Sequence, residues 1–321
     1  MPAKISRLLR HAASTPALAV FRSLNLRPVE RLLYSSHLKS KADHSSRLPA
    51  LSNFEREAVR ELEREGVFVT SLAALGLPGT SEMVAAGNEI SSALANGSRG
   101  PRSRSWKLSS AAIADSEVYR AIFEWGLHPT LLNIVEGYLG LPPAYDGPKV
   151  TYTPADGLQA GTRLWHRDRE DRRMMKIAIY LTDVPYSGGP LECLKREVYD
   201  GPIDRDFNYP VFTHAQLERR FGRPIIDADI TSCIGPAGTV VFMDTVRLFH
   251  RGKPALDVER RAIFQSYFSR NPRHPFFCER SDLSRAELAR FAKHLSYPAQ
   301  RDAVSWRDVI GWKRFVPTSV V

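Results

Sequence analysis

The stretch "MKIAIYLTDV", residues 175–184, is a short apolar run that is rich in β-branched and aromatic side chains. Such runs favour β-strands, and turn residues follow this one directly in "YSGGP", residues 186–190. Similar runs lie on both sides of it: "KVTYTPA" (149–155), "PLECL" (190–194), "TVVFMDTV" (239–246) and "RRAIFQSYF" (260–268). Many short strands with turn signals between them predict an all-β sandwich or barrel after about residue 143.

Helical patterns precede this series of strands. Residues 53–65 carry apolar side chains at helical spacing, and Asn53 is placed to cap the first turn. Helical spacing returns at residues 115–138, where Pro129 predicts a break. The predicted fold class is therefore mainly β with flanking helices (α+β), in a single domain over residues 49–321.

The first 48 residues differ from the rest in charge. Residues 1–49 hold nine Lys and Arg against two acidic residues, whereas the remaining chain holds 36 against 33. The excess positive charge thus belongs to an N-terminal extension, residues 1–48, and this argues against nucleic-acid binding by the body. The extension is interpreted as an arm that packs loosely on the body. A transit peptide and a helix with weak contact to an anionic membrane surface are the alternatives.

The cellular location follows from two weaker signals. No apolar run approaches the ~20 residues that a membrane-spanning helix needs. Cys193, Cys233 and Cys278 are few, odd in number and widely spaced, which favours small buried thiols in a reducing compartment over a disulfide framework. We expect a cytoplasmic protein, with an organelle as the alternative if the extension is a targeting segment.

A candidate metal site begins in "LWHRDRED", residues 164–171. On a strand, His166 and Asp168 would point to the same face, because side chains alternate. A third ligand should come from a strand that is near in space and distant in sequence. In "GTVVFMDTVRLFHRGKP", residues 238–254, His250 stands at the end of a strongly apolar strand. Two His and one carboxylate on one face form the facial triad of non-haem Fe(II) oxygenases.

A basic strand follows the third candidate ligand. It opens with Arg260 and Arg261, and a guanidinium beside an iron site can hold the distal carboxylate of 2-oxoglutarate through two parallel hydrogen bonds. An exposed, charged strand start is the alternative. The two arginines point to opposite faces, and the apolar pattern barely separates those faces. Ala262 would leave room beside Arg260, which favours Arg260.

Taken together, "WHRD", "KIAIYLTDV", "GGPLE", "AGTVVFMD" and "HRGKP…ERRAIF" resemble the phytanoyl-CoA dioxygenase family of Fe(II)/2-oxoglutarate oxygenases over roughly residues 50–270. The resemblance implies a double-stranded β-helix (jelly-roll, cupin-like) core and iron ligation by His166, Asp168 and His250. It also implies a salt bridge from the Arg of "RRA" to 2-oxoglutarate. The family's Arg usually precedes a small residue by two positions, which again favours Arg260. Tyr180 occupies the strand where the family often has an aromatic side chain beside the cosubstrate.

The expected activity is that of an Fe(II)- and 2-oxoglutarate-dependent dioxygenase. It would use O₂ to hydroxylate or otherwise oxidise a small organic or lipid-like molecule, with release of succinate and CO₂. The segment "CLKREVYDGP", residues 193–202, departs from the family pattern, so no particular substrate is implied. The alternatives are a non-catalytic jelly-roll binding or sensory protein and a zinc-dependent hydrolase on the same ligands. No sequence motif supplies the general base that a hydrolase needs.

Overall fold

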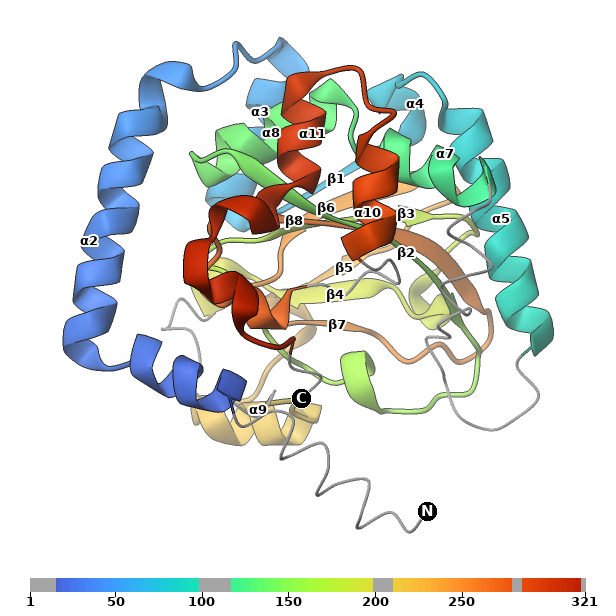
Figure 1. Ribbon diagram of the computed structural model, residues 1–321. Coiled ribbons are helices and arrows are strands. Elements are labelled where there is room, and N and C mark those ends of the chain that lie inside the picture. Colours follow the sequence, from blue (N-terminus) through green and yellow to red (C-terminus); the bar gives the residue numbers. More distant parts are fainter. Residues whose placement is uncertain (1–15, 98–116, 199–209, 279–284, 319–321) are drawn as a thin grey trace, which may run out of the picture.

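The structure is a computed structural model that describes residues 16–97, 117–198, 210–278 and 285–318 (Figure 1). In these ranges the strands form one five-stranded sheet, with the order β1-β6-β3-β8-β2, and one three-stranded sheet, with the order β5-β4-β7. Every pairing between neighbours is antiparallel. The strands are β1 (Val67–Ser71), β2 (Pro143–Thr153), β3 (Met175–Tyr180), β4 (Leu191–Leu194), β5 (Ile230–Cys233), β6 (Thr239–Asp244), β7 (His250–Gly252) and β8 (Arg260–Ser269).

The order in which the chain visits the two sheets defines the fold. β2, β3, β6 and β8 belong to the larger sheet, whereas β4, β5 and β7 belong to the smaller one. The short segment Trp165–His166, between β2 and β3, extends the smaller sheet because His166 pairs with His250 of β7. Two facing antiparallel sheets, between which the chain passes repeatedly, form a double-stranded β-helix. The predicted α+β fold with a jelly-roll core is confirmed.

Because side chains alternate along a strand, the two faces of the larger sheet pack against different parts of the protein. On β3, Ile177 and Ile179 belong to the large apolar cluster that contacts the helices. Ala178 and Tyr180, one residue out of phase, belong to the cluster enclosed between the two sheets. The larger sheet therefore has one face for stability and one for the interior of the jelly roll.

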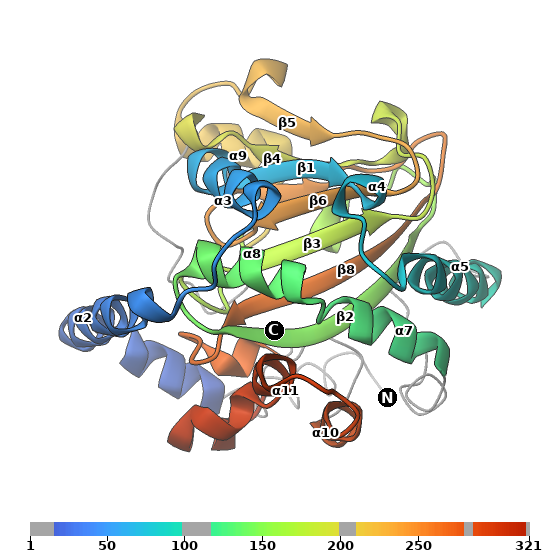
Figure 2. The same cartoon turned by 90° about the horizontal axis from the view of Figure 1, so that it is seen from above.

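Helices cover the outer face of the larger sheet, as Figure 2 shows from above. The break predicted at Pro129 is confirmed, because α8 begins there. The cap predicted for the first body helix is displaced by one residue: Ser52, and not Asn53, accepts from the Glu55 N–H, while Glu55 accepts from the Ser52 N–H. The helices are α2 (Arg27–His44), α3 (Asn53–Glu65), α4 (Leu72–Leu75), α5 (Thr80–Gly97), α7 (Glu117–Trp125), α8 (Pro129–Leu139), α9 (His214–Phe221), α10 (Arg285–Ala292) and α11 (Pro298–Val304).

The N-terminal extension contacts the body in the part that the structure describes, residues 16–48. Phe21 is 2% exposed and packs against Phe277, which precedes the C-terminal helices. Arg273 donates to the Glu30 carboxylate at 2.8 Å, and this ion pair fastens the beginning of α2. Residues 1–15 of the extension lie outside the described residues. No helix of the described chain is long and apolar enough to cross a membrane.

Candidate metal centre

His166 and His250 lie directly opposite each other on neighbouring segments of the smaller sheet. The His166 N–H donates to the His250 carbonyl (3.0 Å), and the His250 N–H donates to the His166 carbonyl (2.9 Å). The centroids of the two imidazole rings are 4.2 Å apart. This backbone pairing holds both side chains on the same face of the sheet, and both are at least 95% buried.

The prediction that His250 ends an apolar strand is wrong in its detail. β6 ends at Asp244, and His250 opens β7 in the other sheet. The physical cause is the Asp244 carboxylate, which accepts from the Val246 and Arg247 N–H groups at 3.1 Å each and so turns the chain. Tyr138 donates a further hydrogen bond of 2.6 Å to the same carboxylate, so Asp244 is a structural acid.

The hydrogen bonds of the two imidazoles engage the same nitrogen of each ring. His166 Nδ1 lies 2.7 Å from the Leu164 carbonyl, and His250 Nδ1 lies 3.1 Å from the Leu248 carbonyl. A carbonyl can only accept, so Nδ1 carries a proton, and in the neutral imidazole Nε2 is then the atom whose lone pair can bind a metal. Hydrogen bonds from one ring nitrogen to a backbone carbonyl are typical of metal-binding histidines, because they fix the tautomer and the orientation of the ring.

Asp168 supplies the third ligand from an irregular segment. The predicted strand over these residues is limited to Trp165–His166; beyond it the chain is held by the Asp168 N–H, which donates to the Thr245 carbonyl at 2.8 Å. Asp168 is fully buried, and its Oδ2 lies 3.9 Å from His250 Nε2. The ligand atoms of His166, Asp168 and His250 all lie within 4.8 Å of one another. Ligands bound at right angles to one ion lie roughly 3 Å apart, so small side-chain rotations would complete the site.

The electrostatics of the group suit a cation. Burial is the main cause that lowers the pKa of His250 well below its ordinary value; the neighbouring His166 acts in the same direction and Asp168 opposes it. The imidazole is therefore neutral, which is the form that binds metals. Lys176 of β3 places its Nζ 2.5 Å from Asp168 Oδ2 and neutralises the buried carboxylate.

A cavity of about 390 Å³ opens beside this group, between the two sheets. His166 and His250 line it at one side, and Arg260 at the start of β8 lines it as well. Apolar surface comes from Ala178 and Phe264, which lie on the inner face of the larger sheet. The volume lies within the range of about 300–1,000 Å³ that is typical of small-molecule sites.

Arg260 and Arg261 have different surroundings. Arg260 is 5% exposed, and Gly252 leaves space for it, since a Cβ at that position would lie 2.7 Å from the Arg260 guanidinium. One of its N–H groups donates to the Gly189 carbonyl, but its buried Nε has no hydrogen-bond partner among the described residues. Arg261 instead forms an ion pair with Glu259 at 2.6 Å. Arg260 thus faces the cavity with an unused donor, and Arg261 does not line it.

Tyr180 lies next to the cavity and not in its lining. Its hydroxyl donates to the Cys233 carbonyl (2.8 Å) and accepts from the Leu191 N–H (3.0 Å), so it ties β3 to β4 and β5. Burial raises the pKa of Tyr180, while the nearby Arg260 lowers it. The aromatic ring that was expected beside the cosubstrate thus lies behind the cavity lining, and its hydroxyl is already engaged by the backbone.

Sequence reasoning missed Arg163, which also lines the cavity. Arg163 is 5% exposed and forms an ion pair with Asp156, yet one of its terminal nitrogens is buried without a hydrogen-bond partner among the described residues. Its charge acts on Arg260 and lowers the pKa of that side chain, in addition to the larger effect of burial. The signal in the sequence is weak, because Arg163 precedes the metal ligands in a short helical turn (Gly161–Arg163) that no pattern predicts.

Two facing sheets that enclose a buried His–Asp–His group define a jelly-roll protein with a candidate metal centre.

No protein-family model and no curated protein matches the chain. Solved structures with a similar backbone include SnoK, a non-heme, alpha ketoglutarate dependent carbocyclase from nogalamycin biosynthesis, with 18% identity, 69% of this chain and 85% of that chain covered, and a TM-score of 0.47. HygX from Streptomyces hygroscopicus, solved with nickel and 2-oxoglutarate, has 16% identity, coverages of 69% and 88%, and a TM-score of 0.46. The epimerase SnoN, solved with Fe³⁺, alpha ketoglutarate and nogalamycin RO, has 15% identity, coverages of 68% and 84%, and a TM-score of 0.45. The chemistry of this chain is inferred from its own side chains.

Proposed function

We propose that this protein is an Fe(II)- and 2-oxoglutarate-dependent dioxygenase that hydroxylates or otherwise oxidises a small organic or lipid-like substrate. The observation that carries the proposal is the position of a buried His166–Asp168–His250 group on the same cavity as a buried arginine with an unused donor. Bound Fe(II) would supply the redox chemistry that couples decarboxylation of 2-oxoglutarate to succinate and CO₂ with oxidation of the substrate by O₂.

The donor set fits Fe(II). Two imidazoles whose Nδ1 atoms face backbone carbonyls would bind the ion through Nε2, and together with one carboxylate they would leave its other side open to the cavity. Lys176 pairs with Asp168, so the carboxylate is not an isolated buried charge when no metal is present. The role of these residues is to hold the ion rigidly and to keep bulk water away from it.

Arg260 is the residue that we propose to hold the distal carboxylate of 2-oxoglutarate. Its burial and its free Nε favour a strong, charge-assisted hydrogen bond to an anion. Arg261 is already neutralised by Glu259 and lies on the other face of β8. Tyr180 would position the Arg260 side chain by holding β3 against the smaller sheet.

The charge of the cavity points to an anionic group on the substrate as well. Besides Arg260, its lining includes Lys149, Arg163 and Lys176, and none of the described residues that line it is Asp or Glu. Lys176 pairs with Asp168 and Arg163 pairs with Asp156, but one terminal nitrogen of Arg163 is buried without a hydrogen-bond partner among the described residues. We therefore propose a small substrate that carries a carboxylate or phosphate and lays its apolar part on Ala178 and Phe264.

The same observation weighs against a zinc hydrolase. A hydrolase needs a general base that reaches the attacking water, and none of the described residues that line the cavity is Asp or Glu. The motifs from 165 to 264 support a relationship to the phytanoyl-CoA dioxygenase family, which we propose on sequence resemblance. All three cysteines are buried thiols, which supports a reducing compartment such as the cytoplasm.

The experiment is reconstitution of the purified protein with Fe(II), 2-oxoglutarate, ascorbate and air, with succinate measured by mass spectrometry. We expect succinate to form slowly without a substrate and faster with molecules from a panel of small carboxylates and phosphate esters. Zn(II) in place of Fe(II) should give none. Absence of succinate under all these conditions, with one Fe(II) bound per chain, would indicate a binding or sensory protein instead.

A further inference from the structure

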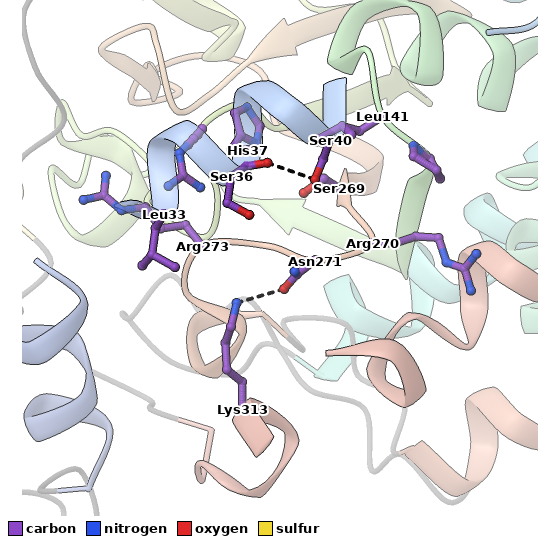
Figure 3. A pocket seen from close by; sticks show the side chains of 12 residues that line it. Leu33, Ser36, His37, Ser40, Leu141, Ser269, Arg270, Asn271, Arg273 and Lys313 are labelled. Atoms are coloured by element: carbon purple, nitrogen blue, oxygen red, sulfur yellow. Dashed lines mark hydrogen bonds between the residues drawn. The ribbon is translucent and has the colours of Figure 1, made fainter. Parts of the chain in front are cut away.

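A second cavity lies where the N-terminal helix α2 meets the body (Figure 3). It has a volume of about 180 Å³. Its walls come from five separate parts of the chain: Ser36 and His37 of α2, Leu141 and Pro142 before β2, Arg172 after the metal ligands, Ser269 to Arg273 at the end of β8 and beyond it, and Lys313 near the C-terminus. A ligand in this cavity would therefore touch both the extension and the body.

The lining of this junction cavity is strongly basic. It includes Arg172, Arg270, Arg273 and Lys313, and none of the described residues that line it is acidic. The nearby acids compensate only part of this charge. Arg273 is paired with Glu30 at 2.8 Å, whereas the partner of Arg270 is an Asp302 side chain that is 59% exposed and lies 3.2 Å away. Surface pairs of that kind contribute little.

Several donors at the cavity are unused. Arg270 Nε is buried and has no hydrogen-bond partner among the described residues. The Arg172 guanidinium makes no hydrogen bond with another described residue; only its backbone N–H is engaged, by Asp171. Lys313 Nζ donates to Asn271 (2.8 Å) and to the Pro272 carbonyl (3.3 Å), which leaves its third N–H available.

The local potential is positive in consequence. Burial lowers the pKa of Lys313; the nearby Asp171 raises it, and the charge of Arg172 lowers it. Burial lowers the pKa of His37 as well, where the charge of Arg172 is the next cause and Asp171 again acts in the opposite direction. Buried cations that repel one another are costly to fold unless an anion binds between them.

We propose that the junction cavity binds a phosphate group, as inorganic phosphate or as the end of a small phosphate monoester, and that the bound group fastens α2 to the body. Arginines in planar, bidentate geometry and a lysine are the side chains that recognise phosphate, and a phosphate ester presents three acceptor oxygens to the unused donors of Arg172, Arg270 and Lys313. The volume of the junction cavity also suits a group of the size of phosphate. It exceeds the ~30 Å³ of one water and is smaller than the ~300 Å³ at which drug-sized pockets begin.

The test is calorimetric titration of the full-length protein with inorganic phosphate at low ionic strength, with chloride as the buffer anion. Arg172→Gln and Arg270→Gln should each weaken phosphate binding about tenfold or more, the order of one hydrogen bond to a charged group. Arg60→Gln removes the same charge from an exposed position on α3 and should leave binding unchanged. Equal affinity in all of these proteins, or no binding by the wild type, would overturn the proposal.

Two further experiments determine where the phosphate binds. Arg163→Gln should affect only phosphate that binds in the metal cavity, so the binding that depends on Arg172 and Arg270 should persist in this variant; if Arg163→Gln abolishes all phosphate binding, the phosphate occupies the metal cavity and the proposal is wrong. Phosphate should also slow tryptic cleavage within α2, at sites such as Arg31 and Lys39, severalfold in the wild type and not in Arg172→Gln. Equal cleavage rates with and without phosphate would contradict the fastening of α2.

Titrations with glycerol 3-phosphate and with vesicles that contain phosphatidic acid distinguish a soluble phosphate ester from a lipid headgroup. Binding of glycerol 3-phosphate that Arg172→Gln weakens supports a soluble ligand. Binding of the vesicles alone, with the same dependence on Arg172, assigns the phosphate to a lipid headgroup. Binding of the vesicles that Arg172→Gln and Arg270→Gln do not change would overturn the proposal.

Discussion

The metal cavity and the junction cavity are both lined by basic side chains, but they are built differently. Strands and the segments paired with them supply the ligands of the metal cavity, and backbone hydrogen bonds between His166 and His250 fix their positions. The junction cavity is walled by a helix, a loop and the C-terminal region, which only tertiary packing brings together. The comparison teaches that the metal centre should tolerate changes in the extension, whereas the junction cavity should not.

The largest expected effect is the loss of activity when a candidate metal ligand is removed. His166→Ala, Asp168→Ala and His250→Ala should each reduce succinate formation below detection, because each removes one of only three protein ligands. The fold should remain, since the apolar clusters of the jelly roll do not include these side chains. Circular dichroism and thermal unfolding check the fold. Full activity in any one variant removes that residue from the centre.

The next effect concerns the far end of the metal cavity. Arg260→Leu should raise the concentration of 2-oxoglutarate needed for half-maximal turnover about a hundredfold or more, because two hydrogen bonds to a charged group contribute roughly 1.5–3 kcal/mol each. Iron binding should be retained. Arg261→Leu is the matched control and should have a much milder effect, since Arg261 pairs with Glu259 outside the cavity. The reverse ranking would transfer the role to Arg261.

A smaller effect tests the independence of the extension. Phe21→Ala removes a ring that packs against His274 (4.9 Å between centroids) and Phe277 (5.8 Å), at a cost of about 3–5 kcal/mol to the attachment of the extension. Hydrogen exchange in α2 should become faster while turnover is retained. Leu32→Ala, on an exposed position of α2, should change neither property. Loss of turnover in Phe21→Ala would show that the extension supports the metal cavity.

The smallest expected effect is a pH dependence of protein stability that arises from His274, which contacts Phe21. Burial, and then the charge of Arg273, lower the pKa of His274 well below its ordinary value of 6.5, so the folded protein holds this imidazole neutral. The unfolded chain takes up the proton first. Stability from this group is therefore complete above about pH 6.5 and falls by about 1.4 kcal/mol per pH unit below it.

Denaturant titrations between pH 7 and pH 5 measure that slope. His274→Phe should reduce it by about one proton, because the ring remains and the titrating group is gone. His294→Phe, at an exposed position, serves as the control. An unchanged slope in His274→Phe means that other buried groups account for the acid sensitivity.

The strand-rich core could be predicted from the sequence, because apolar, β-branched runs separated by Gly/Pro turns favour a sandwich or barrel, whereas the jelly-roll arrangement followed only from the resemblance to the phytanoyl-CoA dioxygenase family. The sequence was also sufficient to single out His166, Asp168 and His250 as a group. The apolar pattern alone could not separate Arg260 from Arg261, since both faces of β8 carry aromatic or aliphatic side chains, and Arg260 was favoured on Ala262 and on the family pattern. The distinction in the structure depends on contacts from elsewhere in the chain: Gly252 leaves space for the Arg260 guanidinium, and the Gly189 carbonyl accepts from it.

Other features depend on contacts that no local pattern encodes. The turn after β6 follows from the side chain of Asp244, which collects N–H groups from the residues after it. Arg163 reaches the metal cavity from a short helical turn, and Arg172 lies on the same cavity as residues of α2 that are more than a hundred positions away in the sequence. Such long-range contacts escape prediction because they are set by packing and not by periodicity.

The central claim is that His166, Asp168 and His250 hold one Fe(II) to which 2-oxoglutarate binds. Its most direct test is an anaerobic titration of the metal-free protein with Fe(II) and then 2-oxoglutarate, followed by visible absorption, because a 2-oxo acid that chelates Fe(II) gives a charge-transfer band. The account predicts one Fe(II) per chain, a band that appears only when 2-oxoglutarate is added, and no band in His250→Ala. An equally strong band in His250→Ala, or none in the wild type with both Fe(II) and 2-oxoglutarate bound, would contradict it.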